Sequence, residues 1–484
     1  MKNYRFERER MLNRIKMLDD DECIACGRCI AACRFGAIKF VHGNNGNIEP
    51  CITENICKKC SACETACKNT ERRNDDYTSS SHYIGRSKNE DCIYGGASGG
   101  LFYEISKDVI RNLAGCVFGA TFDHQSQSVV FMKCETMGEL ERIRKSKYVQ
   151  SSWINVKEDI DDAIQQNRWI LISGLPCQIE ALHDLYGGYK KSLFVDVYCR
   201  GVIGAEYFRE YLKMFDCDVL DVDFRGEGKK INFTFTLIGK NDRVILQEAC
   251  EANILYQAFA NGSILKHKCF DCPMSRYKHR ADITLGDFSD EKTARERGLS
   301  LNHMSFFAVN TKKGEAILKR ISKQLNYFEV SDNELIGGYY PDHKQQTGAW
   351  GYNEELRDAF QKEIKESGSI KMALAATFKY EMMLIQRLEN YFSHVDIYIY
   401  GAGTVGRRIV GLIRLLHEDW NIKCFVVTHH FEDGLIDGLK IMTVDEIDID
   451  NHSVILVAAS KRIANEMIYE LEKREINRYI SYKC

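Results

Sequence analysis

Eight of the twenty cysteines form two copies of one spacing near the N-terminus, and cysteine is the residue type here most able to do chemistry. The spacing is C-x2-C-x2-C-x3-C, and its members are Cys23, Cys26, Cys29 and Cys33, then Cys57, Cys60, Cys63 and Cys67. Soft thiolates at two-residue gaps suit one corner of a cuboidal 4Fe-4S cluster, whereas a zinc site needs only four ligands at looser spacing. The doubled pattern therefore predicts two 4Fe-4S clusters and electron transfer.

Residues 21–70 resemble bacterial-type ferredoxin modules, in which the fourth cysteine of each set ligates the other cluster. The resemblance implies one cluster on Cys23, Cys26, Cys29 and Cys67 and another on Cys57, Cys60, Cys63 and Cys33. Arg34 and Lys68 stand where the family usually has proline. Cys51 lies outside both sets, and we expect it to be an ordinary buried thiol.

Four more cysteines follow apolar stretches further along the chain. The segments RWILISGLPCQIEAL (168–182) and KSLFVDVYCRGV (191–202) predict a strand, a helix and a parallel strand. Cys177 and Cys199 would then lie at the same carboxyl edge of a sheet, where such sheets bind ligands. Cys269 and Cys272 form a C-x2-C pair. We interpret the four as ligands of a third 4Fe-4S cluster, with a four-cysteine zinc site, unligated thiols or one redox-active cysteine as alternatives.

Two further segments have the composition of an anion-binding site. GGASGGLFYEISKDVIRNL (95–113) places a glycine-rich turn before a helix with Leu101, Ile105, Val109 and Leu113 on one face. We expect Ser98 to be the N-cap, and the exposed amides there suit a phosphate. RKSKYVQSSW (144–153) combines basic and polar side chains that could bind an anionic cofactor, with a solvated basic turn as the alternative.

The elements that must position these residues indicate a multidomain chain of α/β and α+β class. Its 484 residues predict two to four domains. Residues 1–20 are expected to be a charged helical lead-in, 21–70 a ferredoxin-like module with two 4Fe-4S clusters, and 71–90 a polar linker. Residues 92–345 alternate strand-like and amphipathic runs and predict a mixed α/β domain, and 346–394 predict a helical connector.

Residues 395–484 predict a small Rossmann-like domain. VDIYIYGAGTVGRRIVGLI (395–413) is a strand, the turn Gly401-x-Gly403-x-x-Gly406, and a helix. The second strand ends in Thr428, His429 and His430, where a dinucleotide site would have an acidic residue. Nucleotide or nucleotide-sugar binding and an accessory domain that keeps the Rossmann-like shape both remain open. The two histidines are expected to be exposed loop residues.

Bulk composition excludes several function classes. The formal net charge of −3 and the isoelectric point of about 6.5 provide no electrostatic footprint for nucleic acid. The N-terminus lacks the apolar region of a signal peptide, and no apolar run approaches the roughly 18 residues that cross a bilayer. We therefore expect a cytoplasmic protein without a transmembrane segment.

Five motifs, in the order in which they occur, resemble those of the beta subunits of coenzyme F-420-reducing hydrogenase and F-420-linked formate dehydrogenase. The motifs are GGASGG, SKYVQS, GLPCQIEAL, YCRG and HKCFDCPMSRYKHRADITLGDF, and the resemblance spans about residues 21–345. This family also contains chlorophyll-pathway reductases and bacterial members encoded with capsule or exopolysaccharide genes. The resemblance implies a mixed α/β domain that binds FAD beside a 4Fe-4S cluster.

The resemblance also implies roles for individual residues. The flavin-side turn would be Ser98, Gly99 and Gly100, and the flavin and substrate pocket would be lined by Ser146, Lys147, Tyr148, Gln150 and Ser151. The cluster would be held by Cys177, Cys199, Cys269 and Cys272, and Asp282, Gly286 and Asp287 match the closing motif. Arg200 replaces the usual histidine, and Ser289-Asp290 replace the usual tryptophan–glycine. F-420 is therefore not carried over as the substrate.

Together these features predict an iron–sulfur flavoprotein oxidoreductase. An external donor or acceptor, such as a ferredoxin or a reductase, would exchange electrons with the N-terminal clusters. The electrons would then reach the third cluster and FAD, and FAD would exchange a hydride with an organic substrate. The same resemblance places this substrate in surface-polysaccharide synthesis. We expect Lys147 to be the catalytic residue, with its positive charge acting near the flavin or the substrate. The alternatives are an electron-transfer subunit for a separate catalytic protein and a redox-sensing scaffold.

Overall fold

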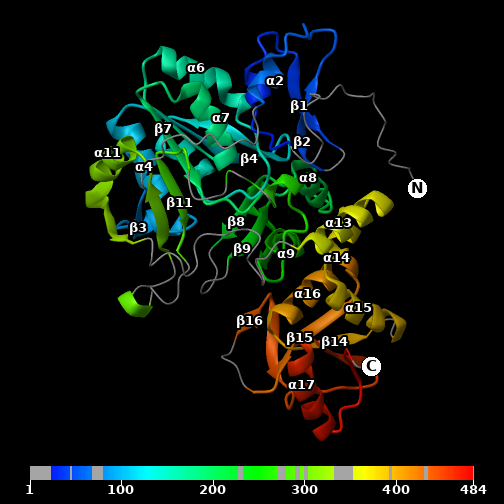
Figure 1. Ribbon diagram of the computed structural model, residues 1–484. Coiled ribbons are helices and arrows are strands. Elements are labelled where there is room, and N and C mark those ends of the chain that lie inside the picture. Colours follow the sequence, from blue (N-terminus) through cyan, green and yellow to red (C-terminus); the bar gives the residue numbers. More distant parts are fainter. Residues whose placement is uncertain are drawn as a thin grey trace. The chain divides into compact units, whose positions relative to one another are not determined.

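The computed structural model divides the chain into two compact units, Met1–Arg225 with Leu265–Gln346, and Gly226–Ile264 with Thr347–Cys484 (Figure 1). It describes residues 23–43, 46–67, 80–226, 233–270, 272, 274, 279–288, 295–298, 303–331, 353–391, 395–429 and 434–482. The charged lead-in expected over residues 1–20 lies outside the described residues.

The N-terminal part of the first unit is a small α+β module, drawn in blue in Figure 1. Strand β1 (Ile38–His42) pairs antiparallel with β2 (Ile48–Ile52), and two short helices, α1 (Arg28–Ala31) and α2 (Ala62–Ala66), lie in contact. The apolar cluster contains only two buried residues, Cys29 and Ile38, with a few half-buried neighbours. A core this small needs help from bound groups or from packing against a larger domain.

The rest of the first unit is built on one mixed eight-stranded sheet with the strand order β13-β3-β12-β11-β7-β6-β4-β5. The strands are β3 (Ser81–Ser87), β4 (Cys116–Asp123), β5 (Ser128–Cys134), β6 (Ile170–Gly174), β7 (Ser192–Val197), β11 (Ile283–Asp287), β12 (Ser305–Val309) and β13 (Leu325–Val330). Strands β4, β6, β7 and β11 are parallel neighbours, and the other pairings are antiparallel. The predicted mixed α/β class is confirmed.

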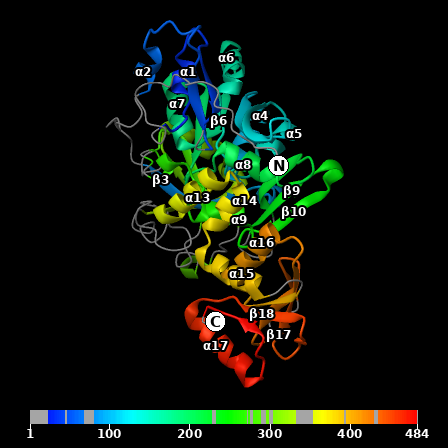
Figure 2. The same ribbon diagram turned by 90° about the vertical axis from the view of Figure 1, so that its right-hand side faces the viewer.

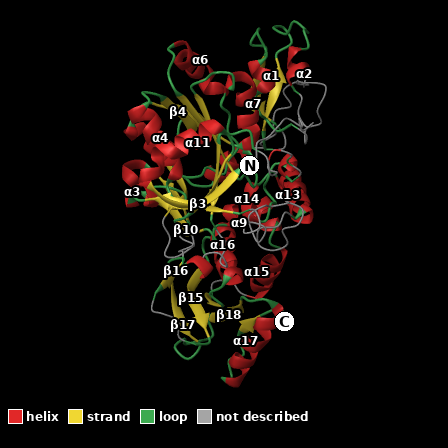
Figure 3. Ribbon diagram, turned by 60° about the vertical axis from the view of Figure 1, so that its left-hand side comes forward, coloured by secondary structure: helices red, strands yellow, loops and turns green. Residues whose placement is uncertain are grey.

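Helices cover both faces of this sheet, so its central strands are apolar on both sides. On one face, α4 (Leu101–Asn112) and α11 (Lys312–Ile321) lie side by side over residues such as Leu171 and Leu193 (Figure 3). On the other, α6 (Lys157–Gln165) and α7 (Pro176–Tyr186) cover Ile170, Ile172 and Phe194. The predicted apolar face of α4 is confirmed, since Leu101, Ile105 and Val109 are buried.

The interpretation of residues 71–90 as a linker is wrong for its second half. Residues 81–87 form β3, which lies inside the sheet and pairs antiparallel with both β12 and β13. Its sequence, SHYIGRS, has only one aliphatic side chain, Ile84, so its local pattern is polar. Pairing with strands more than 200 residues away decides its structure. Residues 71–79 lie outside the described part.

Shorter elements complete the first unit. They are α3 (Glu90–Tyr94), α5 (Met137–Leu140), α8 (Ala205–Leu212), β8 (Asp221–Gly226) and the 3-10 turns Glu141–Ile143, Ile154–Val156, His267–Cys269 and Ser322–Gln324.

The second unit contains the predicted Rossmann-like domain. Its six-stranded sheet has the order β16-β17-β15-β14-β18-β19, parallel except for β16. The elements are β14 (Asp396–Tyr400), α16 (Thr404–Leu416), β15 (Asn421–Val427), β16 (Leu435–Ile436), β17 (Leu439–Thr443), β18 (Ser453–Val457), α17 (Lys461–Lys473) and β19 (Tyr479–Ile480). The predicted strand, glycine turn, helix and strand are confirmed.

The expected helical connector is also present, as α13 (Glu354–Ser367), α14 (Ile370–Ala376) and α15 (Lys379–Tyr391) (Figure 2). An insertion from the middle of the chain joins this unit: β9 (Thr234–Ile238), β10 (Val244–Ala249) and α9 (Ile254–Ala260). Helix α16 approaches the start of α9 and the residues before it so closely that a Cβ at Gly411 would overlap the Ala252 carbonyl oxygen. Within the described residues, no helix has the length and apolar character needed to cross a membrane.

Gly411→Ala is expected to destabilise the second unit by about 1–3 kcal/mol, because the added methyl group has no room against α9. Hydrogen exchange of the α16 amides measures this effect within the unit. The matched control is Gly138→Ala in α5, where nothing lies within 4 Å of the added methyl group. That change should stabilise its helix by up to about 1 kcal/mol. Stabilisation by both substitutions would contradict the close approach of α16 and α9.

Candidate iron–sulfur centres

The two N-terminal cysteine loops repeat in backbone conformation as well as in sequence. Ala25 and Lys59, at equivalent positions, have positive φ angles of 53° and 51°, and Gly27 and Ser61 have 85° and 57°. The Ala25 amide donates to Cys23 Sγ at 3.3 Å, and the Lys59 amide donates to Cys57 Sγ at 3.4 Å. Left-handed conformations at non-glycine residues are costly, so their recurrence indicates that both loops are shaped to present amides to sulfur.

Thiols of the two N-terminal loops affect one another's pKa values, and the crossed ligand sets that the ferredoxin resemblance implies stay a prediction. Burial raises the pKa of Cys29, and the charges of Cys26, Cys23 and Cys67 raise it further. Burial likewise raises the pKa of Cys67 to about 12, with Cys26 and Cys23 adding to the effect. Burial also raises the pKa of Cys63, where Cys33 contributes. Cys67 therefore lies near the first loop, and Cys33 near the second. Cys51 is buried, as expected.

The first cysteine loop is attached directly to the central sheet domain. The buried Trp153 donates its indole N–H to the Cys26 carbonyl at 2.8 Å. Arg28, in α1, donates to the Glu180 carbonyl at 3.0 Å and pairs with Asp184 at 2.7 Å, both on α7. Since α7 also carries Cys177, these contacts hold the first loop beside the predicted third cluster.

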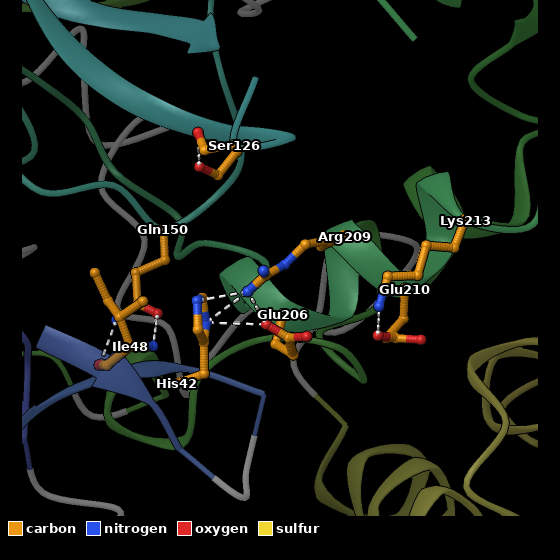
Figure 4. Close-up of polar contacts among 9 residues, drawn as sticks. His42, Ile48, Ser126, Gln150, Glu206, Arg209, Glu210 and Lys213 are labelled. Atoms are coloured by element: carbon orange, nitrogen blue, oxygen red, sulfur yellow. Dashed lines mark hydrogen bonds and ion pairs between the residues drawn. The ribbon is translucent and has the colours of Figure 1, made fainter. Parts of the chain in front are cut away.

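The β1–β2 hairpin is attached at two further points, to Gln150 and to helix α8 (Figure 4). Gln150 accepts from the Ile48 amide at 2.8 Å and donates to its carbonyl at 3.3 Å. His42 approaches both Glu206 and Arg209 of α8, with its Nδ1 2.9 Å from the Glu206 carboxylate. Gln150, expected at the flavin pocket, therefore also ties the module to the central domain.

The four cysteines assigned to a third cluster line one pocket in the first unit, at the carboxyl ends of β6 and β7. Its empty volume, open solvent included, is about 610 Å³. The lining residues are Ile24, Ala25, Gln150, Ser151, Leu175, Pro176, Cys177, Gln178, Cys199, Gly201, Val202, Lys266, Lys268, Cys269 and Cys272. Segments far apart in the sequence thus bring four thiols together.

Burial and neighbouring thiols both raise the pKa values in this pocket. Burial raises the pKa of Cys177, and Cys272, Cys199 and Cys269 raise it further, as does Cys26 of the N-terminal module. Burial raises the pKa of Cys269 to about 12, with Cys272 adding to the effect. The described residues contain no group of three or more histidine, cysteine, aspartate or glutamate side chains that could hold a single metal ion. A cuboidal cluster is wider than one ion and needs its ligand sulfurs further apart.

Gly201 permits the close approach of two of these cysteines. Its φ angle is +112°, and a Cβ there would lie 2.9 Å from Leu265 Cδ1 and 3.1 Å from Cys269 Cβ. Its amide donates to Cys199 Sγ at 3.4 Å. Only glycine combines this conformation with this contact, so Gly201 both shapes the Cys199 loop and directs an N–H at the sulfur.

Two of the residues expected at a flavin form hydrogen bonds within the protein. Ser98 Oγ lies 2.8 Å from Ser305 Oγ, which also accepts the Gly99 amide at 2.9 Å. The expectation that Ser98 caps α4 is wrong, because Gly100, with a φ angle of +79°, is the N-cap. The Ser98 hydroxyl and the Gly99 amide are thus hydrogen-bonded to Ser305, and the flavin-side role of this turn stays a prediction.

Lys147 and its neighbours lie outside the cysteine pocket, apart from Gln150 and Ser151. The Lys147 ammonium donates to the carbonyls of Arg142 and Arg144 in its own loop. Withdrawal from water lowers its pKa to about 8, partly offset by Asp221 and Asp223. The ring of Tyr148 meets Phe224 edge-on at 5.9 Å, and Ser146 is half-buried.

The closing motif serves the fold. The Asp282 carboxylate accepts from the Phe194 amide at 2.8 Å and from Thr311 Oγ1 at 2.6 Å. Asp287 pairs with Arg225 at 2.6 Å, and a Cβ at Gly286 would lie 2.7 Å from Tyr198 Cδ2. These residues fix β11 beside β7, the strand that leads to Cys199.

Sequence reasoning missed three polar residues around the cysteines. Gln178, buried at the start of α7, accepts from the Leu175 amide at 2.9 Å and donates to the Ser151 carbonyl at 3.0 Å. His279 forms a buried 2.6 Å pair with Asp196 in β7. Lys266 lines the pocket. Only proximity to a cysteine in the sequence could have indicated Lys266, three residues before Cys269.

In the second unit, the glycine turn is closely packed at Gly401 and Gly406, whereas nothing lies within 4 Å of a Cβ placed on Gly403. A Cβ at Gly401, whose φ angle is +119°, would lie 2.6 Å from the Ala458 carbonyl oxygen. Arg407, in the first turns of α16, binds the Asp437 carboxylate through two bonds of 2.8 and 2.9 Å. Thr428 is hydrogen-bonded to Tyr400, and His429 is exposed, as expected. His430 lies outside the described residues. Nucleotide binding and the accessory role of this domain both stay predictions.

Comparison with known families agrees with the two parts described above. Residues 17–39 match the 4Fe-4S binding domain, a range that includes the first cysteine set. Residues 167–334 match the model for the C-terminal part of the coenzyme F420 hydrogenase/dehydrogenase beta subunit, and this range includes the four cysteines of the pocket. The residues expected at the flavin, Ser98 to Ser151, precede this range.

No curated protein matches the chain. Among solved structures, a chain of the F420-reducing [NiFe] hydrogenase complex from Methanosarcina barkeri matches with 12% identity and a TM-score of 0.35. The match covers 64% of this chain and 93% of that one. The resemblance expected from the sequence is thus confirmed for two parts of the chain, a 4Fe-4S binding domain and a domain of the F420 hydrogenase/dehydrogenase beta-subunit family.

Proposed function

We propose that this protein conducts electrons through three 4Fe-4S clusters in a fixed order. The outer cluster would be held by Cys57, Cys60, Cys63 and Cys33, the inner one by Cys23, Cys26, Cys29 and Cys67, and the third by Cys177, Cys199, Cys269 and Cys272. One observation carries the proposal: Ile24 and Ala25 of the inner loop line the same pocket as the four cysteines of the third set.

The burial of the cysteines supports the direction of this order. Cys60, in the outer set, is exposed, whereas Cys29 of the inner set is buried. The inner loop is the one that Trp153 and Arg28 attach to the central domain. A cluster supplies one-electron transfer when bound, and the chain supplies the thiolates and the amides that donate to them.

A flavin and an organic substrate would extend this route beyond the third cluster. FAD is implied by the family resemblance alone, since the Ser98 and Gly99 groups expected beside it are bound to Ser305. The proposed electron route therefore ends at the third cluster. Reoxidation of the reduced protein by F-420 or by sugar nucleotides would identify a substrate. No reoxidation by either would favour an electron-transfer subunit that serves a separate catalytic partner, as the beta-subunit match suggests.

Iron analysis of anaerobically purified protein should find about twelve irons per chain, four for each cluster, and one FAD if the resemblance extends to the flavin. Cys199→Ser should lower the iron content to about eight, because it removes a ligand of the third cluster alone. Cys217→Ser is the matched control, since Cys217 is exposed and outside all three sets. About eight irons in the unaltered protein, or no difference between the variants, would remove the third cluster from the proposal.

The proposed external partner is an acidic electron-carrier protein that docks beside the outer cluster. The described residues there include the exposed basic side chains of Arg34, Lys58 and Lys59 and the exposed apolar side chains of Phe35 and Ile56. Basic charge beside apolar contacts suits a transient complex with an anionic redox protein.

Replacing both Lys58 and Lys59 with Glu should slow reduction by an acidic ferredoxin about tenfold at low salt, because attraction becomes repulsion. The difference should shrink at high ionic strength. Stopped-flow reduction measures the rate, and reduced methyl viologen, a small cation, serves as the partner-independent reductant. The double substitution Lys312→Glu and Lys319→Glu on α11 makes the same charge change away from the cysteines. Equal slowing by both pairs would exclude a docking role for the outer face.

If Lys147 acts through its charge beside a bound flavin, Lys147→Met should slow flavin reduction about tenfold without changing cluster absorbance. With its pKa lowered to about 8, the ammonium is lost as the pH rises through that value, so the rate in the unaltered protein should fall there. Lys147→Arg should keep its rate to higher pH, because a guanidinium stays charged. Unchanged reduction in Lys147→Met would remove Lys147 from the mechanism.

A further inference from the structure

Lys266 is a buried cation in the wall of the cysteine pocket. Only 4% of its surface is exposed, and no hydrogen-bond partner for its Nζ lies among the described residues. The backbone around it is held, because its amide donates to the Val202 carbonyl at 3.3 Å and its carbonyl accepts from the Cys269 amide at 3.0 Å. The side chain is therefore kept at the pocket by a fixed main chain.

A buried ammonium without a partner is strongly unfavourable unless an anion is close. The described lining of the pocket contains no aspartate or glutamate. Its cations are Lys266 and Lys268, and its groups able to carry negative charge are the four cysteines. Lys266 and Cys269 line this pocket together, and a backbone hydrogen bond joins them.

A 4Fe-4S cluster on four thiolates is a net anion and gains one more negative charge on reduction. Its reduction potential depends on the charges and hydrogen bonds around its sulfurs. A fixed cation beside it favours the reduced form, because attraction to the ammonium grows when the electron arrives. The Gly201 amide, which donates to Cys199 Sγ at 3.4 Å, acts in the same direction.

We infer that Lys266 is the internal counter-cation of a 4Fe-4S cluster on Cys177, Cys199, Cys269 and Cys272, and that it raises the reduction potential of this cluster. The inference rests on the proposed function. With the clusters bound, the inner one would give up one electron and the third would gain it, while the Lys266 side chain would stay beside the third as the compensating positive charge. The raised potential makes the third cluster the point at which the electron settles.

Lys268 provides an internal comparison. It lines the same pocket but is half-buried, so solvent screens its charge. Lys266 should therefore have the larger effect on the cluster, although both side chains carry the same charge and lie two residues apart.

The test is a redox titration of the full chain, followed by electron paramagnetic resonance, with Lys266→Met, Lys266→Arg and Lys268→Met. Lys266→Met should move the third cluster to a more negative potential by at least a tenfold change in its one-electron equilibrium, which corresponds to about 59 mV. Lys266→Arg should restore most of the shift, and Lys268→Met should produce a smaller one. The signals of the other two clusters should not move, which shows that the variants are folded.

The outcomes separate this inference from the proposed function. About twelve irons in every variant with no shift in Lys266→Met would overturn the role of Lys266 and leave the three-cluster route intact. Loss of about four irons in Lys266→Met but not in Lys266→Arg would support the inference, because the charge is then needed to hold the cluster. Loss of these irons in both Lys266→Met and Lys266→Arg would overturn the inference, because the cluster would then require the shape of the lysine side chain rather than its charge. About eight irons in the unaltered protein would end the three-cluster proposal itself.

Discussion

The hydrogen bond from Trp153 to the Cys26 carbonyl is the contact on which the proposed electron route depends. It holds the first cysteine loop against the central domain, together with the pairing of Arg28 to α7. Electron transfer between clusters requires that they lie close and stay close. A ferredoxin-like module with so small an apolar core cannot fix its own position, so the larger domain has to supply the anchoring side chains. The Gln150–Ile48 bonds add a second point of attachment.

Charge is the second constraint on this unit. Burying four thiols in one pocket raises the pKa of Cys177 and its neighbours, so the thiolates that bind iron need compensation. The chain provides amides that donate to Cys23, Cys57 and Cys199 and, at the third set, a buried lysine. The same groups that make ligation possible also influence the potentials. The positions of the ligand sulfurs and the reduction potentials therefore depend on the same amides and the same lysine.

The second unit depends instead on glycine residues, which allow its backbone segments to pack closely. Gly401 and Gly406 allow the turn after β14, and Gly411 allows α16 to approach α9. Arg407, near the turn, is bound to Asp437, which joins α16 to the segment between β16 and β17. Part of this unit comes from residues 226–264, in the middle of the chain, so the unit combines two segments that are separated in the sequence.

Cysteine spacing by itself determined the candidate metal ligands, because cluster chemistry demands particular residues at particular gaps, and the patterns around Cys177 and Gly401 were enough to predict strand, turn and helix. Apolar periodicity likewise identified the inner face of α4. Only the tertiary structure decided that residues 81–87 are a strand, because β3 is stabilised by partners distant in the sequence. It also decided that Gly100 rather than Ser98 caps α4, and that Lys266 is buried beside four thiols. Those features depend on which long-range neighbours exclude water or accept a hydrogen bond, and local sequence does not contain that information.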